Sequence, residues 1–257
     1  MATNKTETRK PVVVVDDVHV IYKVFPGGKR VGSRGTKGIK VNQKTKMREV
    51  HAVKGVTFTI YEGETVGIIG SNGSGKSSLM RVLAGITQAT KGAVFASSRP
   101  TLLGVGAALM PNLSGEKNIL LGGMALGFAR KDMEKSLEAI TEFAGLQEAI
   151  DLPMRTYSQG MSARLRFAIA AHRTHDILII DEALAVGDKA FRLRSEARMR
   201  EMRDDAGTVF LVSHSMKSIK DTCNRVLWLE KGDLRMDGDP ETVIAAYEKY
   251  VEEQADE

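Results

Sequence analysis

The sequence is poor in the features that mark secreted or membrane-spanning chains. Its 257 residues include one cysteine, Cys223, which excludes an internal disulfide framework and suits a reducing compartment. No run approaches the ~18 consecutive apolar residues of a spanning helix, because the densest runs, Val12–Val15 and Ile177–Ile180, have the length of strands. The first ten residues are polar and lack the apolar segment of a signal peptide. We therefore expect a chain that is soluble by itself and needs another protein for any membrane role.

The charge imbalance is small. A formal net charge of +5 permits an anionic partner, although such an excess is usually ordinary solvated surface. An apolar content of 42% is sufficient for a core, and the length suits one large domain or two small ones.

The strongest signal is a glycine-rich segment that follows a short apolar run, Val66–Ile69. The segment reads Gly70-Ser71-Asn72-Gly73-Ser74-Gly75-Lys76-Ser77-Ser78. The pattern Gly-x-x-x-x-Gly-Lys-Ser predicts the strand, loop and helix start of a nucleoside triphosphate site. Its glycines let successive N–H groups face phosphate oxygens, and the helix start adds its positive dipole end.

In such a site Lys76 reaches the β- and γ-phosphates, and the Ser77 hydroxyl holds Mg²⁺. The alternative is a glycine-rich surface turn before an amphipathic helix. Strand context, spacing, lysine and serine all agree with the phosphate loop, which is the interpretation we adopt.

The segment Pro11–Tyr22 is rich in β-branched residues and predicts a strand, placed at a sheet edge because of Pro11. Tyr22 closes this strand. Its ring could stack on a nucleotide base, which is worth roughly 1–3 kcal/mol by analogy with other base-stacking sites. A tyrosine in the core or at its rim fits the sequence equally well, and both alternatives remain open.

The next stretch, Pro26–Arg48, is basic and glycine-rich. We expect a loop because it is too polar to bury a face. It could bind phosphates of lipid or nucleic acid, or it could be an inert insertion between two strands. Its eight basic residues, with no acidic residue among them, are Lys29, Arg30, Arg34, Lys37, Lys40, Lys44, Lys46 and Arg48.

Beyond the phosphate loop the pattern becomes largely helical. We expect a helix over Ser77–Leu83, a strand over Gly92–Ala96, a helix that begins at Ser114 and a helix over Asp132–Phe143. A helical run over Ala163–Thr174 then precedes an apolar strand that ends in Asp181-Glu182. Further strands are expected at 208–213, 226–230 and 234–236, followed by a helix at 240–251 capped by Asp239.

The order of these motifs resembles the ATP-binding cassette (ABC) family over Val12–Gly238. The family orders its motifs as phosphate loop, helical insert, signature segment at a helix start, and apolar strand ending in Asp-Glu. The resemblance implies that Asp181 orients Mg²⁺ through water and that Glu182 polarises the attacking water. His214 matches the histidine that contacts the γ-phosphate. Without the family context, Asp-Glu could simply begin a loop, and a lone histidine is usually structural.

The signature segment is degenerate. Tyr157-Ser158-Gln159-Gly160-Met161 stands where the family usually has Leu-Ser-Gly-Gly-Gln. In the family this helix start binds the γ-phosphate of ATP held by the other cassette, so Ser158 and Gly160 imply a homodimer. Alone, such a serine would more often be only a helix cap. Asp188 matches the loop at the dimer seam.

One family residue is missing. The family usually carries a glutamine between Val94 and the helical insert, where it contacts Mg²⁺ and relays to the membrane partner, and Leu102–Gly106 contains none. The chain resembles ATPase subunits of lipid-linked polysaccharide exporters for O-antigen, teichoic acid and actinobacterial galactan in the combination of three segments, which are Leu102–Gly106, Tyr157–Met161 and Asp181–Asp188. Some members append a carbohydrate-binding domain, and we expect none within these 257 residues.

The resemblance implies an α/β fold of the P-loop NTPase type, with a mainly parallel sheet, an antiparallel β subdomain and a helical signature subdomain. We expect a polar tail over 1–10, an ATP-binding core over 11–104 and 166–238 with the basic insertion 26–48, the signature subdomain over 105–165, and a C-terminal helix and tail over 239–257. Catalytic roles fall to Lys76, Glu182 and His214, and Mg²⁺ binding to Ser77 and Asp181. The expected ATP contacts are Tyr22, Ser71, Asn72, Gly73, Ser74, Gly75, Lys76, Ser77, Ser78, Ser158, Gly160 and Asp188.

The resemblance also implies a separate membrane permease, a polyprenyl-diphosphate-linked glycan carried by it, and a place at the cytoplasmic face of the membrane. Residues 26–48 could contact anionic lipid there. A rival function is a soluble cassette ATPase that acts on nucleic acid, but paired cassettes, long coiled coils and zinc insertions are not evident. A GTPase is weaker still, because no Asn-Lys-x-Asp motif follows the loop.

Overall fold

The computed structural model describes residues 9–24, 48–103, 109–173, 175–181, 188–213 and 215–255. Nearly all of the basic stretch Pro26–Arg48 lies outside these ranges, as do Glu182 and His214. The predictions made for these residues are therefore not addressed by the structure.

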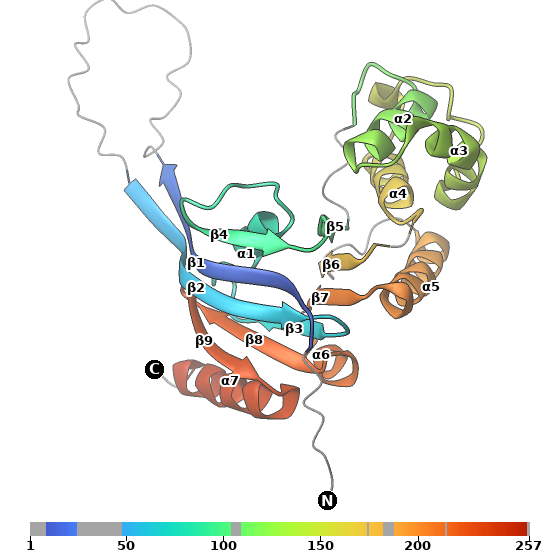
Figure 1. Cartoon of the computed structure of the whole chain (residues 1–257). Coiled ribbons are helices and arrows are strands. Elements are labelled where there is room, and N and C mark those ends of the chain that lie inside the picture. The colour runs from blue at the N-terminus through green and yellow to red at the C-terminus, as the bar shows by residue number, and fades with distance from the viewer. Residues whose placement is uncertain are drawn as a thin grey trace, which may run out of the picture.

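An antiparallel sheet of three strands in the order β2-β1-β4 forms one layer (Figure 1). Its strands are β1 (Pro11–Val24), β2 (Arg48–Tyr61) and β4 (Lys91–Ala96). The prediction that the first strand lies at an edge is wrong, because β1 is the central strand. Pairing with β4 begins only at Val13, so Pro11, which has no N–H to donate, faces β2 alone at the start of the strand.

The second sheet has the order β5-β6-β7-β3-β8-β9 and is parallel except for its last strand. Its central strands are short and almost wholly buried, as expected for a parallel sheet covered on both faces. The strands are β3 (Thr65–Ile69), β5 (Thr101–Leu102), β6 (Ile177–Asp181), β7 (Thr208–Val212), β8 (Arg225–Glu230) and β9 (Asp233–Gly238).

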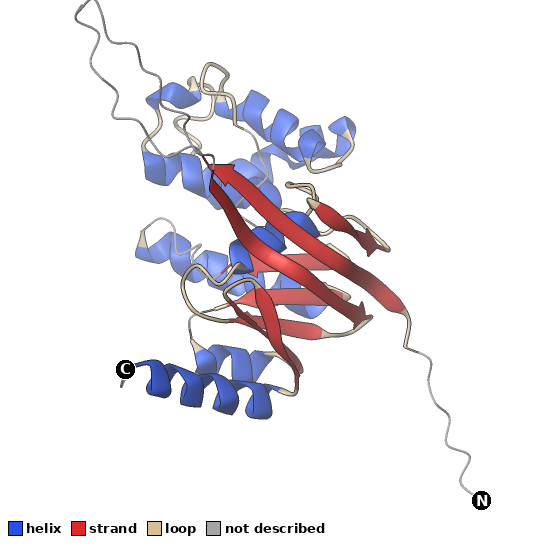
Figure 2. Ribbon diagram, turned by 90° about the vertical axis from the view of Figure 1, so that its left-hand side faces the viewer, coloured by secondary structure: helices blue, strands red, loops and turns tan. Residues whose placement is uncertain are grey.

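Four helices accompany this sheet. Helix α1 (Lys76–Leu83) follows β3 after the phosphate loop, and α7 (Pro240–Ala255) lies along β8 and β9 at the end of the described chain (Figures 1 and 2). The predicted cap of α7 is confirmed, because the Thr242 N–H donates to Asp239 Oδ1 at 2.9 Å. The other two helices are α5 (Lys189–Asp205) and α6 (Met216–Thr222).

A separate group of helices stands beside the parallel sheet (Figure 1). It consists of α2 (Gly115–Ala125), α3 (Arg130–Ala144), a short 3₁₀ turn (Met154–Thr156) and α4 (Gln159–Ala170). These elements share an apolar core of their own, which includes Ile119, Met133, Ile140 and Leu165. The predicted start at Ser114 is confirmed, because its Oγ accepts from the Lys117 N–H.

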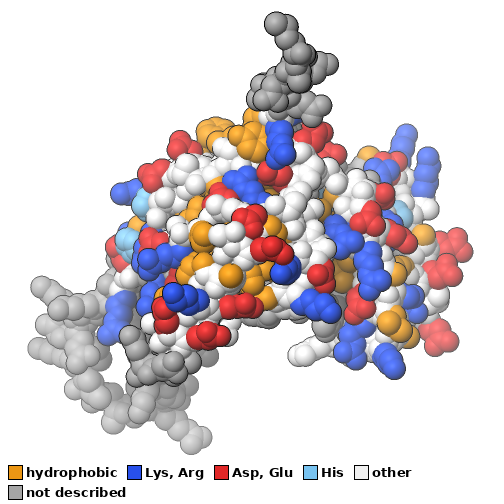
Figure 3. Space-filling model, turned by 90° about the horizontal axis from the view of Figure 1, so that it is seen from below, with side chains coloured by type: hydrophobic (Ala, Val, Ile, Leu, Met, Phe, Trp, Pro, Cys, Tyr) orange, Lys and Arg blue, Asp and Glu red, His pale blue; other side chains and the backbone are white. Residues whose placement is uncertain are grey.

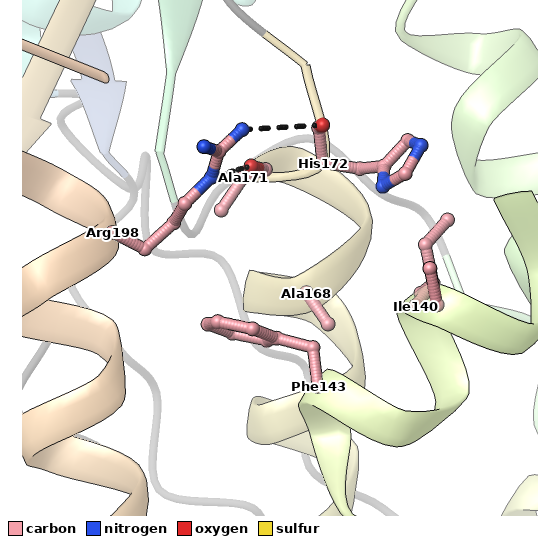
Figure 4. A pocket seen from close by; sticks show the side chains of 7 residues that line it. Ile140, Phe143, Ala168, Ala171, His172 and Arg198 are labelled. Carbon is pink, nitrogen blue, oxygen red and sulfur yellow. Dashed lines mark hydrogen bonds between the residues drawn. The ribbon is translucent and has the colours of Figure 1, made fainter. Parts of the chain in front are cut away.

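Helix α4 is as long as predicted but lies four residues earlier, from Gln159 to Ala170 and not from Ala163 to Thr174. Arg198 of α5 explains the early end. Its guanidinium donates to the carbonyl oxygens of Ala171 and His172 at 2.8 and 3.3 Å (Figure 4). These contacts fix the chain in a turn beyond α4, next to an apolar cavity of about 170 Å³ between α3, α4 and α5.

Candidate functional site

The predicted phosphate loop lines a polar cavity of about 270 Å³ at the carboxyl ends of the parallel strands. Its walls are Asn72–Ser78 after β3, Asp181 at the end of β6, Val212 at the end of β7, and Ala52 of β2. These strands are neighbours in the order β6-β7-β3, which is why residues more than 100 positions apart meet here. The carboxyl edge of such a sheet is where ligands of α/β proteins bind.

The loop packs against the backbone of β8 at its first glycine. Gly70 has a φ of +143°, and a Cβ at this position would lie 1.9 Å from the carbonyl oxygen of Leu229. Only glycine therefore fits this position without a backbone shift.

Lys76 is folded onto the loop that precedes it. Its Nζ donates to the carbonyl oxygens of Gly70 and Ser71 at 2.7 and 2.8 Å and to Ser74 Oγ at 3.3 Å. Burial lowers the pKa of Lys76, and the negative charges of Glu230 and Asp181 oppose that shift. The ammonium group is thus held at the cavity by oxygen acceptors that phosphate oxygens can replace.

The oxygen donors present suit a hard cation. The structure places Ser77 and Asp181 in the lining of the same cavity. Among the described residues no group of three or more His, Cys, Asp or Glu side chains could hold a metal ion by itself. Mg²⁺ is usually bound by one or two protein groups together with substrate phosphates, and Ser77 and Asp181 are two such groups.

Tyr22 lies next to the loop helix. Its hydroxyl donates to Ser78 Oγ at 3.3 Å, and its ring is partly buried against the core of the two sheets. These contacts show a tyrosine at the rim of the core. Base stacking by the same ring stays a prediction.

Ser158 and Gly160 stand at the start of α4 and do not line the cavity. Ser158 caps the helix, because its Oγ accepts from the Met161 N–H at 3.1 Å. The space beside Gly160 is open, with Ser158 Oγ the nearest atom to an added Cβ at 3.8 Å. The helix start is therefore accessible, while its contact with a second cassette stays a prediction.

Asp188 caps α5 and also lies outside the cavity lining. The hydrogen bond from the Phe191 N–H, 2.8 Å long, lowers the pKa of Asp188. Arg164 of α4 lies 3.6 Å from the same carboxylate and acts in the same direction.

Sequence reasoning missed the contribution of the β8–β9 hairpin. The buried carboxylate of Glu230 accepts from the Ser71 hydroxyl at 2.6 Å, and the Gly232 N–H donates to the Ser74 carbonyl oxygen at 2.9 Å. The only sequence signal was an acidic residue at the end of the apolar run Val226–Leu229, and that pattern is equally typical of a residue that enters a turn.

Figure 3 shows one face of the molecule, seen from below relative to Figure 1. Basic and acidic side chains are interspersed there over the described part of the chain. No helix in that part is both long enough and apolar enough to cross a bilayer.

Comparison with known proteins matches residues 53–185 to the family described as ABC transporter. The chain is 42% identical over 205 residues to the teichoic acids export ATP-binding protein TagH of Lactococcus lactis subsp. lactis (strain IL1403), which covers 80% of this chain and 44% of that protein. It is also 38% identical over 242 residues to the O-antigen export system ATP-binding protein RfbB of Klebsiella pneumoniae. This match covers 92% of this chain and 98% of RfbB. The chain spans about half the length of the first TagH proteins that it matches.

A solved structure agrees with the fold. The ATP-binding cassette MJ0796, in a dimeric post-hydrolysis state bound to ADP and Pi, superposes with a TM-score of 0.64 at 19% identity. The match covers 89% of this chain and 98% of that chain. The α/β P-loop fold expected from the sequence is thereby confirmed.

Proposed function

The chain belongs to the ABC transporter family, and from this premise we propose that it is the ATP-hydrolysing subunit of an exporter for a lipid-linked polysaccharide. The main support for ATPase activity is the polar cavity at the edge of the parallel sheet, which Lys76 and Asp181 both line. The names of the relatives, which are export proteins for teichoic acids and O-antigen, support the substrate class.

The phosphate loop binds the triphosphate of ATP. Lys76 leaves the carbonyl oxygens of Gly70 and Ser71 and contacts the β- and γ-phosphates, while N–H groups of the loop and of the start of α1 face the phosphate oxygens. Ser77 and Asp181 would hold Mg²⁺, and the bound ion would neutralise charge on the phosphates.

Hydrolysis requires a base beside the γ-phosphate. Glu182 follows Asp181 directly at the end of β6, and we assign it this role from its position in the sequence, with His214 as a γ-phosphate contact. Both residues lie outside the described residues, so the assignment rests on the family motifs.

The site is completed by a second copy of the chain. Ser158 and Gly160 of one cassette face the γ-phosphate bound by the other, and Asp188 lies at the seam. The open space beside Gly160 supports this arrangement, because an added Cβ there would have only Ser158 Oγ of the described chain within 4 Å. Closure of the dimer on two ATP molecules drives a separate membrane permease, which places the ATPase at the cytoplasmic face of the membrane.

The chain divides accordingly. We assign the two sheets with α1, α5 and α6 to the ATP-binding core and the helices α2–α4, with their own apolar core, to the signature subdomain. The tail 1–10 and residues 239–257 flank them.

The test measures ATP binding and hydrolysis by the purified full-length chain. Glu182→Gln should keep ATP binding and lower hydrolysis by roughly 10²–10⁴, the range for loss of a general base. Lys76→Ala should weaken ATP binding itself, whereas Lys91→Ala, at an exposed position on β4, serves as the matched control and should bind normally.

Near-wild-type turnover in Glu182→Gln would contradict the assignment of the base, and equal ATP affinity in Lys76→Ala would contradict the phosphate loop. Co-expression with the membrane subunit then tests the transport role, since glycan export should be lost with the Glu182→Gln variant.

A further inference from the structure

The β8–β9 hairpin follows the phosphate loop along its length. Gly70 faces the Leu229 carbonyl, Ser71 contacts Glu230, and the Ser74 carbonyl accepts from the Gly232 N–H. The hairpin turn itself is tight, because both of its residues, Lys231 and Gly232, have positive φ values of 50° and 90°. This geometry is typical of a two-residue turn and presents the end of β8 to the loop in one fixed orientation.

Among these three contacts between the hairpin and the phosphate loop, the one between Glu230 and Ser71 joins two side chains. Its carboxylate accepts from Ser71 Oγ at 2.6 Å and from the Ser71 N–H at 3.3 Å. The residue is only 2% exposed, and Tyr247 of α7 is near enough for the Glu230 charge to help raise the pKa of its hydroxyl, for which burial is the larger cause. A buried carboxylate binds a hydroxyl and an N–H more strongly than an exposed one does, because water does not compete.

Ser71 is therefore held from two directions. Glu230 binds its N–H and hydroxyl, and Lys76 binds its carbonyl oxygen. The second contact is the one that Lys76 must give up in order to reach a phosphate. Once Lys76 has left the Ser71 carbonyl oxygen, the Glu230 carboxylate is the side-chain group that still holds Ser71 in the structure.

We propose that Glu230 is a positioning residue of the nucleotide site, which keeps the Ser71 end of the phosphate loop in its binding shape while Lys76 changes partners. This inference rests on the proposed function, because it concerns the loop that binds ATP. Glu230 acts through Ser71 and does not itself touch the nucleotide.

The test measures the affinity of the full-length chain for ATP with Mg²⁺, together with the steady-state KM and kcat. Glu230→Ala should weaken ATP binding about tenfold, the size expected for losing a hydrogen bond to a charged group, and should raise KM more than it changes kcat. Glu230→Gln keeps one acceptor oxygen for the Ser71 hydroxyl and should lose only part of the affinity, about threefold. Adding Ser71→Ala to Glu230→Ala should cause little further loss, because the two groups form one contact.

Glu64 provides the matched control. It is another buried acid, 8% exposed, whose carboxylate accepts from Arg225 at 3.0 Å and does not line the cavity. Glu64→Gln should lower stability without changing ATP affinity. The amide hydrogen exchange of Ser71 without nucleotide is a further readout, which should be faster in Glu230→Ala than in Glu64→Gln.

Wild-type ATP affinity in a folded Glu230→Ala variant would overturn the role of Glu230. If that variant does not fold, affinity equal to the wild type in Glu230→Gln would overturn it instead. Failure of the wild-type chain to bind ATP would refute the proposed function, so the two failures are distinguishable.

Discussion

Replacing Gly70 with alanine is expected to destabilise the fold far more than the same replacement at Gly73. Both glycines have positive φ values, +143° and +81°, but their surroundings differ. An added Cβ at Gly70 would lie 1.9 Å from the backbone oxygen of Leu229, while nothing lies within 4 Å of one at Gly73. Alanine at Gly73 therefore tests backbone strain alone, and alanine at Gly70 tests backbone strain together with a steric clash.

The magnitudes follow from these contacts. Gly73→Ala carries only the cost of a left-handed conformation, about 1–2 kcal/mol. Gly70→Ala combines backbone strain of about 1–3 kcal/mol with overpacking of about 1–3 kcal/mol against backbone that cannot rotate away. Gly70→Ala should therefore lose roughly 2 kcal/mol more stability than Gly73→Ala, and its Tm should be lower than that of Gly73→Ala by about 4–8 °C in a chain of this size.

The free energy of unfolding of each variant can be measured by urea unfolding followed by the fluorescence of Trp228, the one tryptophan of the chain. Trp228 lies on β8 and packs against Tyr247 and Tyr250 of α7, so its signal reports the hairpin that contacts the loop. Equal destabilisation by the two substitutions would refute the close approach of Gly70 to Leu229.

Two further predictions concern the thiol and the dimer. Burial raises the pKa of the Cys223 thiol from 9.0 to about 12, so the folded chain keeps a proton that the unfolded chain loses. Between pH 9.0 and about 12 the Cys223 contribution to the free energy of unfolding should therefore fall by up to about 1.4 kcal/mol per pH unit. Urea titrations should show a shallower fall for Cys223→Ala, in which the raised pKa values of Tyr157 and Tyr247 still contribute. Mixing Lys76→Ala with Ser158→Arg subunits should restore some ATPase activity, because one site of each mixed dimer is intact. Undiminished hydrolysis by Ser158→Arg alone would mean that Ser158 is only a helix cap.

The parts of the site that are local in sequence could be predicted from it. The phosphate loop depends on glycines, a lysine and a serine within nine consecutive residues. The structure brings Gly73, Gly75, Lys76 and Ser77 to one cavity with Asp181, while Gly70 packs against Leu229. Ser114 and Asp239 likewise act on N–H groups three residues away, so their capping roles follow from short spacing.

Contacts between distant segments could not be predicted in this way. The sequence of β1 does not show that β4 pairs on its second side, and Pro11 therefore suggested an edge strand. Glu230 binds a residue 159 positions away, and nothing in either segment indicates the other. The end of α4 depends in the same way on Arg198, which lies 27 positions beyond Ala171.

We propose that two copies of this chain close on ATP held by the phosphate loop. The most direct test is light scattering on the Glu182→Gln variant with and without ATP and Mg²⁺. We expect a dimer with ATP, a monomer without it, and a monomer in both conditions once Lys76→Ala is added. The same molecular mass for Glu182→Gln with and without ATP would contradict it.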